Sequence, residues 1–138
     1  MKTIIVTGAN SGIGKEASLQ LARAGYQVLM LSRDSEKSRT AQREIVAASG
    51  NQNVVLIPVD LAEPASIRQA VAEIQANYPT IDALVNNAGV FNVKRAENAK
   101  GIEMSFAVNY LATFILCQLL IDNLAASGNG RIVNVVSE

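Results

Sequence analysis

Five short apolar runs along the chain predict β-strands. Their Val, Ile and Leu residues are continuous and do not alternate with polar residues. Continuous apolar runs are typical of strands covered on both faces, as in a parallel sheet. The five runs are residues 3–7, 28–32, 54–59, 83–86 and 131–137.

Helical periodicity fills the gaps between these runs. Apolar residues spaced three and four apart predict three helices, because such residues share one helix face. Pro64 is suited to a first helical turn, and Ser35 could cap a fourth helix that runs through Ala47 and ends at Gly50. The three apolar stripes are Ile13, Ala17, Leu21 and Ala24; Ile67, Ala70, Val71 and Ile74; and Ile102, Phe106, Tyr110, Leu116 and Leu120.

Strand and helix alternate along the whole chain, which is the order of a doubly wound α/β fold. Crossovers between parallel strands are right-handed, so we expect a parallel sheet with the strand order 3-2-1-4-5. Residues 1–138 contain no linker, repeat or low-complexity tract and are expected to form one domain. In this order the fifth strand lies at an exposed edge, which invites pairing or aggregation.

The longest uncharged stretch, residues 104–121, has 18 residues and reaches the length of a membrane span. Ser105, Asn109 and Thr113 interrupt it at intervals of four, so they would form a polar stripe on a helix. A buried helix of a soluble protein is the favoured interpretation. The apolar run that opens the chain is too short for a signal peptide.

Composition excludes several classes of protein. The 138 residues are 49% hydrophobic and 17% charged, which leaves ample apolar mass for a core and excludes intrinsic disorder. The 12 basic and 12 acidic residues balance, which argues against a nucleic-acid binder. The chain has no His and only Cys117, so we expect no metal site and no internal disulfide. This usage suits a cytoplasmic protein.

Charge is distributed unevenly despite the zero total. Residues 1–50 carry seven basic and four acidic side chains, a net charge of +3, and the remainder carries −3. A solvated helix face would explain this excess, and so would an anion site in the first half of the chain.

The glycine-rich segment from Thr7 to Lys15 follows the first predicted strand and opens a helix. Helix N-termini present unpaired amides and a positive dipole end, and glycines let a phosphate approach the backbone closely. A plain turn is the alternative. The spacing does not fit a Walker loop, because Gly8 and Gly14 enclose five residues and Glu16 follows Lys15. The pattern G-x-x-x-G-x-G also differs from G-x-G-x-x-G.

At these residues the chain resembles the short-chain dehydrogenase/reductase family. The family's T-G-x-x-x-G-[IL]-G pattern is Thr7 to Gly14, its N-N-A-G pattern is Asn86 to Gly89, and a third motif is Asp60-Leu61. Residues 101–111 are most similar to the retinol-dehydrogenase-like branch. The resemblance implies a Rossmann-type fold that covers about the first half of a family member, truncated after the fifth strand.

The resemblance implies an oxidoreductase that transfers a hydride between a nicotinamide cofactor and a carbonyl or alcohol carbon of a small molecule. It also implies a homo-oligomer in the full-length protein, whereas the expectation of no membrane span rests on the polar stripe within residues 104–121. The glycine loop and the N-N-A-G loop would border one crevice, because the strand order reverses between the first and fourth strands. The cofactor-binding residues expected there are Thr7, Gly8, Asn10, Ser11, Gly12, Ile13, Gly14, Ser32, Arg33, Asp60, Leu61, Asn87, Ala88 and Gly89.

The end of the second strand predicts a preference for NADP(H). The family's acid position, which accepts from the ribose in NAD enzymes, holds Ser32, and Arg33 follows. A guanidinium can hold a 2′-phosphate by charge-assisted hydrogen bonds. Asp34 lies two positions too late to be that acid. The alternative is that Arg33 is only a surface residue; Lys15 and Lys37 are candidate helpers.

Roles for other motif residues also follow from the resemblance. Asp60 would receive the adenine amino group, with a turn residue before the Pro64 helix as the alternative, and Leu61 would line the adenine pocket. Asn86 would brace the sheet, while Ala88 and Gly89 approach the ribose.

The catalytic set is expected to be incomplete in this chain. The resemblance assigns Asn109 to a proton-relay water and Ser137 to the substrate oxygen, with a buried structural Asn and a strand-end cap as the alternatives. No Tyr here is followed by Lys four residues later, so the family's Tyr-x-x-x-Lys is absent. We therefore expect negligible turnover by these residues alone. Phe91 and the residues up to Lys100 are the only candidate substrate contacts.

Two other functions remain open from the sequence. One is a non-catalytic dinucleotide-binding or regulatory module, and the other is a structural interaction module whose glycine loop binds nothing.

Overall fold

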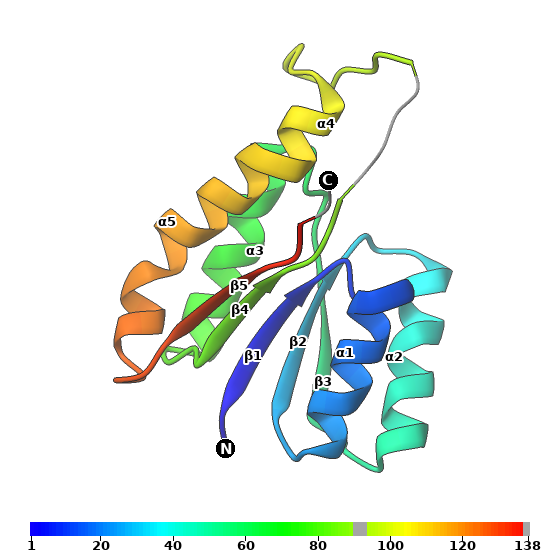
Figure 1. Ribbon diagram of the computed structural model, residues 1–138, viewed down its shortest axis with the longest axis vertical. Coiled ribbons are helices and arrows are strands. Elements are labelled where there is room, and N and C mark those ends of the chain that lie inside the picture. Colours follow the sequence, from blue (N-terminus) through cyan, green and yellow to red (C-terminus); the bar gives the residue numbers. More distant parts are fainter. Residues whose placement is uncertain (90–93, 137–138) are drawn as a thin grey trace.

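The computed structural model describes residues 1–89 and 94–136. Five parallel strands form one sheet in the order β3-β2-β1-β4-β5, which confirms the predicted topology (Figure 1). The strands are β1 (Thr3–Thr7), β2 (Gln27–Ser32), β3 (Val54–Pro58), β4 (Ala83–Asn86) and β5 (Arg131–Asn134).

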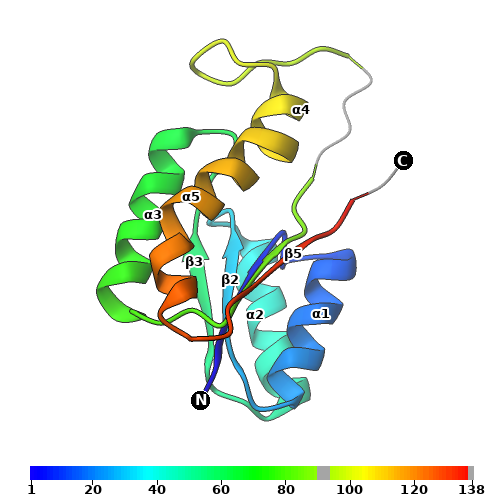
Figure 2. The same ribbon diagram turned by 60° about the vertical axis from the view of Figure 1, so that its left-hand side comes forward.

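Helices cover both faces of the sheet and give the molecule three layers (Figure 2). Helices α1 (Gly12–Arg23) and α2 (Glu36–Ser49) lie on one face, and α3 (Pro64–Asn77) and α5 (Ala112–Ala125) lie on the other. A short helix α4 (Met104–Phe106) and a π-helical stretch η1 (Ala107–Leu111) lead into α5. Helix α4 lies at the end of the molecule toward which the strands point (Figure 1).

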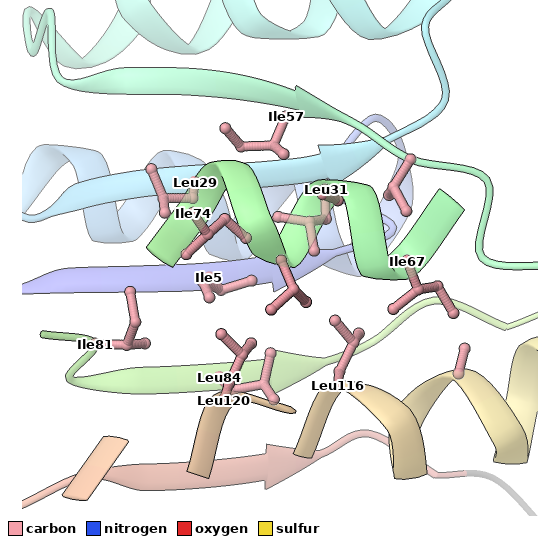
Figure 3. Close-up of a cluster of buried hydrophobic side chains, with 14 of the residues drawn as sticks. Ile5, Leu29, Leu31, Ile57, Ile67, Ile74, Ile81, Leu84, Leu116 and Leu120 are labelled. Atoms are coloured by element: carbon pink, nitrogen blue, oxygen red, sulfur yellow. The ribbon is translucent and has the colours of Figure 1, made fainter. Parts of the chain in front are cut away.

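A buried apolar cluster lies on each face of the sheet, as the continuous runs predict. Under α3 and α5, Ile5, Leu29 and Ile57 of the strands meet Ile74 and Leu116 of the helices (Figure 3). The cluster under α1 and α2 contains the residues that alternate with these along the strands and point to the other face of the sheet, among them Val6, Val28 and Met30. Adjacent residues on one strand thus serve different layers.

The buried face of α1 differs from the predicted stripe. Ile13 is 68% exposed, and the buried residues of this helix are Gly14, Ser18 and Ala22. The physical reason is a close approach: a Cβ on Gly14 would lie 2.1 Å from the carbonyl oxygen of Gly8. A side chain larger than hydrogen does not fit at Gly14, whereas Leu19 and Leu21 pack partly buried against the apolar cluster under this helix.

The stripe predicted from Ile102 to Leu120 is half correct. Leu116 and Leu120 are buried, but Phe106 and Tyr110 are 50% and 60% exposed and stack on each other. The π-helical stretch from 107 to 111 explains the difference, because its wider turn changes the helical phase between the two halves of the stripe.

One helical run in the described ranges, Met104–Ala125, is long and apolar enough to cross a membrane. Only 28% of its most apolar window is buried, so this helix is less buried than expected. Core helices of soluble proteins pass the same test, and a single such helix is weak evidence of a span. The cytoplasmic location stays a prediction.

Two strands end earlier than predicted. Strand β3 ends at Pro58, although Val59 is still buried and its amide donates to the carbonyl of Ser32. Strand β5 ends at Asn134, and Ser137 lies outside the described residues. Strand β5 lies at the predicted edge of the sheet, and all four of its residues are exposed.

Candidate functional site

A cleft of about 580 Å³ opens at the carboxyl ends of the strands. Its walls come from the segments that follow β1, β2, β3 and β4, so the crevice lies where the strand order reverses. The lining residues are Gly8, Asn10, Ser11, Leu31, Ser32, Arg33, Ser35, Lys37, Val59, Asp60, Leu61, Ala62, Asn87, Ala88, Gly89 and Val108.

Most of the residues that the sequence assigns to cofactor binding meet in this cleft. Those that do not line it are Thr7, Gly12, Ile13 and Gly14. Thr7 and Gly14 are buried and have structural tasks, whereas Gly12 and Ile13 are exposed at the start of α1.

The glycine loop needs its glycines for two separate reasons. Gly8 and Gly12 have φ values of 62° and 53°, which side chains rarely adopt. A Cβ on Gly8 would lie 2.9 Å from the Cα of Ala88, so this glycine permits contact with the loop after β4. A Cβ on Gly12 would meet nothing within 4 Å, so only its positive φ requires glycine at this position.

Thr7 fastens the two loops that face each other across the crevice. Its Oγ1 accepts hydrogen bonds from the amides of Asn87 and Ala88, each at 2.9 Å, and the residue is 2% exposed. The Asn87 side chain donates in return to the carbonyls of Thr7 and Gly8, each at 3.3 Å. The first and fourth strands therefore end in one rigid unit.

The N-terminus of α1 carries no side-chain cap in the described structure. Ser11 at the N-cap is extended and its side chain makes no capping hydrogen bond, and the first turn holds no acid. Helix α2 differs, because Ser35 accepts from the amide of Ser38 and Glu36 occupies its first turn. The start of α1 thus presents backbone donors and positive dipole potential beside the cleft.

The end of β2 brings a buried hydroxyl and two cations to the cleft. Ser32 is 6% exposed, and its Oγ has no hydrogen-bond partner among the described residues. Arg33 and Lys37 line the same wall and are exposed. Asp60 is the acid that shares this lining.

The acids next to Arg33 are neutralised by other arginines. Asp34 pairs with Arg39 at 2.6 Å and does not line the cleft. Glu36 accepts hydrogen bonds from Arg43 at 2.9 Å and Arg39 at 3.3 Å. The hydrogen bonds from Arg43 and Arg39 lower the pKa of the Glu36 carboxyl. These acids therefore subtract little from the positive charge at this wall.

Lys15, a candidate helper for anion binding, has another partner. Its ammonium forms an ion pair with Glu44 of α2 and does not line the cleft. Of the two lysines suggested by the sequence, the structure brings only Lys37 to this wall.

Asp60 makes the contacts of a turn residue, and its role toward adenine stays a prediction. Its Oδ1 accepts from the amide of Ala62 at 3.0 Å, and its own amide donates to Ser66, as expected of a turn residue. Asp60 and Leu61 also line the cleft, where the resemblance places the adenine.

Asn86 joins β4 to β5, as the resemblance implies. Its side-chain amide donates to the Oδ1 of Asn134 at 3.0 Å, and these two residues are paired in the parallel register. The Oδ1 of Asn86 is buried and has no partner among the described residues.

Asn109 lies in the π-helical stretch beside the rim of the cleft. A Cβ on Gly89 would lie 3.5 Å from the Oδ1 of Asn109, and its neighbour Val108 lines the cleft. Single π-helical turns are frequent at functional sites. Ser137 and residues 91–93 of the expected substrate segment lie outside the described residues.

Sequence reasoning missed several cleft residues. Ser35 was expected only as a helix cap, although its position two residues after Arg33 is a usable signal. Leu31, Val59, Ala62 and Val108 give no such signal, because their contact with the cleft depends on tertiary packing. Among residues 1–89 and 94–136, no group of His, Cys, Asp and Glu is suited to a metal ion.

Comparison with known proteins identifies relatives over nearly the whole chain. Retinol dehydrogenase 13 of Homo sapiens is 43% identical over 136 residues, which cover 99% of this chain and 41% of that protein. Retinol dehydrogenase 11 of Homo sapiens is 41% identical over 136 residues, 99% of this chain and 43% of that protein. The chain thus spans less than half the length of these curated relatives, and the expected likeness to the retinol dehydrogenase branch is confirmed.

Solved structures agree on the fold. A metagenomic short-chain oxidoreductase in complex with NADP superposes with a TM-score of 0.87 at 31% identity, over 99% of this chain and 62% of that one. A short-chain dehydrogenase from Sphingobium yanoikuyae in complex with NADPH gives 0.84 at 29% identity, over 99% and 54%. The short chain dehydrogenase family matches residues 2–138. The chain therefore belongs to the short chain dehydrogenase family.

Proposed function

We propose that this chain is the cofactor-binding part of an NADP(H)-dependent oxidoreductase. The reaction would interconvert a carbonyl and an alcohol on a small molecule. The observation that carries the proposal is the cleft itself: an uncapped helix start, two cations and a buried unpaired hydroxyl converge where the strand order reverses. Relatives solved with NADP or NADPH support it.

The cleft residues fit the parts of a dinucleotide. Backbone donors at the start of α1 would hold the pyrophosphate, because the N-cap residue Ser11 lines the cleft and lies at the positive end of this helix. Asp60 and Leu61 would hold the adenine, and Ala88 and Gly89 would approach the ribose near the nicotinamide.

Ser32 and Arg33 favour the phosphorylated cofactor. A carboxylate at position 32 would repel a 2′-phosphate, whereas the buried Ser32 hydroxyl needs a partner that this phosphate can provide. The Arg33 guanidinium adds a charge-assisted hydrogen bond. Such a bond contributes roughly 1.5–3 kcal/mol, or about ten- to a hundredfold in affinity.

The bound cofactor would supply the hydride, and the protein would supply orientation and a proton. Asn109 would hold a relay water near the Gly89 rim. The Tyr-x-x-x-Lys of the family is not among these 138 residues. We therefore propose that the chain by itself binds the cofactor without appreciable turnover.

Calorimetric titration of the 138-residue chain with NADPH and NADH tests the proposal. NADPH should bind about ten- to a hundredfold more tightly, and a carbonyl-reduction assay should show no activity above background. Equal affinities would contradict the preference for NADP(H). Clear carbonyl reduction would contradict the proposal that this chain alone binds the cofactor without turnover. Absence of any dinucleotide binding by a folded sample would favour a structural module.

A double variant isolates the specificity residues. Ser32→Asp with Arg33→Ala should reverse the preference toward NADH, because it restores the ribose-accepting acid and removes the phosphate partner. Arg68→Ala is the matched control, since Arg68 is an exposed arginine of α3 on the other face of the sheet. That control should leave both affinities unchanged.

A further inference from the structure

One polar side chain behind the cleft is completely buried. Ser38 belongs to the first turn of α2, has 0% exposure and does not line the cleft. A buried hydroxyl is costly unless it is hydrogen-bonded, so its partners reveal its task.

The Ser38 hydroxyl connects two walls of the cleft. It accepts a hydrogen bond from the side-chain amide of Asn10 at 3.0 Å and another from the Ser35 hydroxyl at 3.0 Å. Asn10 belongs to the glycine loop, and Ser35 belongs to the turn that also carries Arg33. Both partners line the cleft, although Asn10 and Ser38 are 28 residues apart in sequence.

We propose that Ser38 is a positioning residue that sets the distance between the pyrophosphate-binding loop and the 2′-phosphate-binding turn. This inference rests on the proposed function. A phosphorylated dinucleotide must contact the glycine loop and Arg33 at the same time, whereas NADH engages only the first of these phosphate sites. Loss of the connection should therefore weaken NADPH binding more than NADH binding.

Ser38→Ala tests this role without removing the cap of α2. Ser35 would still accept from the backbone amide of residue 38, an interaction of 3.1 Å that does not use the side chain. The ratio of the NADH to the NADPH dissociation constant, measured by calorimetry on the 138-residue chain, should fall about fivefold, the effect of one net hydrogen bond. If Ser38 has only a structural role, the substitution will lower the melting temperature and leave this ratio unchanged.

Two further variants keep the test decisive. Ser38→Cys preserves the size of the side chain but replaces a strong acceptor with a weak one, so it should lower the ratio even if Ser38→Ala fails to fold. Ser49→Ala, at the far end of the same helix, is the matched control and should leave the ratio unchanged.

A double-mutant cycle identifies the partner. If Asn10 and Ser38 act through their contact, Asn10→Ala with Ser38→Ala should lower the ratio no more than the larger single effect. If the two substitutions lower the ratio additively, or if folded Ser38 variants leave it unchanged, the proposed role of Ser38 is wrong. The preference of the wild type for NADPH would still stand. A wild-type ratio near one would instead overturn the proposed cofactor preference, and the Ser38 inference with it.

Discussion

The Thr7 hydroxyl satisfies two backbone amides that would otherwise lack partners near the core. Sequence motifs place Thr7 among cofactor-binding residues, yet the structure buries it beneath the crevice. Ser32 and Arg33 behave differently, because they lie in the cleft where their sequence position predicts. A motif thus mixes residues that line the cleft with residues that only shape the loops around it.

Thr7→Val should destabilise the fold by roughly 1–3 kcal/mol, because it keeps the side chain's shape and leaves two amides unpaired. The free energy of unfolding from urea denaturation measures the effect. Thr7→Ser retains the hydroxyl and serves as the control, with a smaller loss than Val. Equal stability of the Val variant and the wild type would show that the hydrogen bonds from the Asn87 and Ala88 amides to Thr7 do not stabilise the fold.

At the scale of the element, the helices differ in their N-terminal capping: α2 has a side-chain cap, whereas α1 and α3 have none in the described structure. Helix α2 is closed at both ends, by Ser35 and by the left-handed Gly50, as its sequence predicts. Helix α1 begins without a side-chain cap in the described structure. Glu103 is the N-cap of helix α4, and its carboxylate accepts from the amides of Ser105 at 3.0 Å and Phe106 at 2.7 Å.

The Glu103 cap should make stability depend on pH. Hydrogen bonds from the amides of Phe106 and Ser105 lower the pKa of this carboxyl below 4.5 in the folded protein. The stabilisation is therefore complete above the unfolded pKa and is lost as the pH falls through the lowered folded value. In thermal melting at pH 6 and pH 3, the melting temperature of the wild type should exceed that of Glu103→Gln by a larger margin at pH 6.

The Gln variant also carries the Glu36 carboxylate, whose pKa is lowered by the hydrogen bonds from Arg43 and Arg39. Because Glu36 is common to both proteins, the difference between their melting temperatures isolates Glu103. A difference that does not change with pH would show that the charge of Glu103 is irrelevant to the cap.

On the scale of the whole molecule, the cleft exists because the carboxyl ends of four parallel strands lie together at one end of the sheet (Figure 1). Asn98 extends this arrangement by fastening the segment after β4 to the segment after β3. Its side-chain amide donates to the carbonyl of Ala62 at 2.6 Å, and its Oδ1 accepts from the backbone amides of Lys100 and Ile102, each at 2.9 Å. Asn98 is 8% exposed.

Asn98→Ala should lower the free energy of unfolding by roughly 1–3 kcal/mol, because the buried carbonyl of Ala62 and the partly buried amides of Lys100 and Ile102 lose their partner. Hydrogen exchange at the Lys100 and Ile102 amides should accelerate at the same time. Asn77→Ala, at the exposed end of α3, is the control and should change stability by less than about 0.5 kcal/mol. Unchanged exchange in the Asn98 variant would show that the backbone holds this segment without the side chain.

The sequence by itself determined the strands, their order, the glycine loop and the place of Ser32 and Arg33, because short-range periodicity and connection rules govern these features. Tertiary structure decided which face of α1 is buried, where the π-helical stretch turns the long helix, and which polar groups join the loops. The Thr7 and Ser38 contacts join residues 80 and 28 positions apart. Such pairs depend on how closely the backbones approach after folding, and no local pattern of residues encodes that distance.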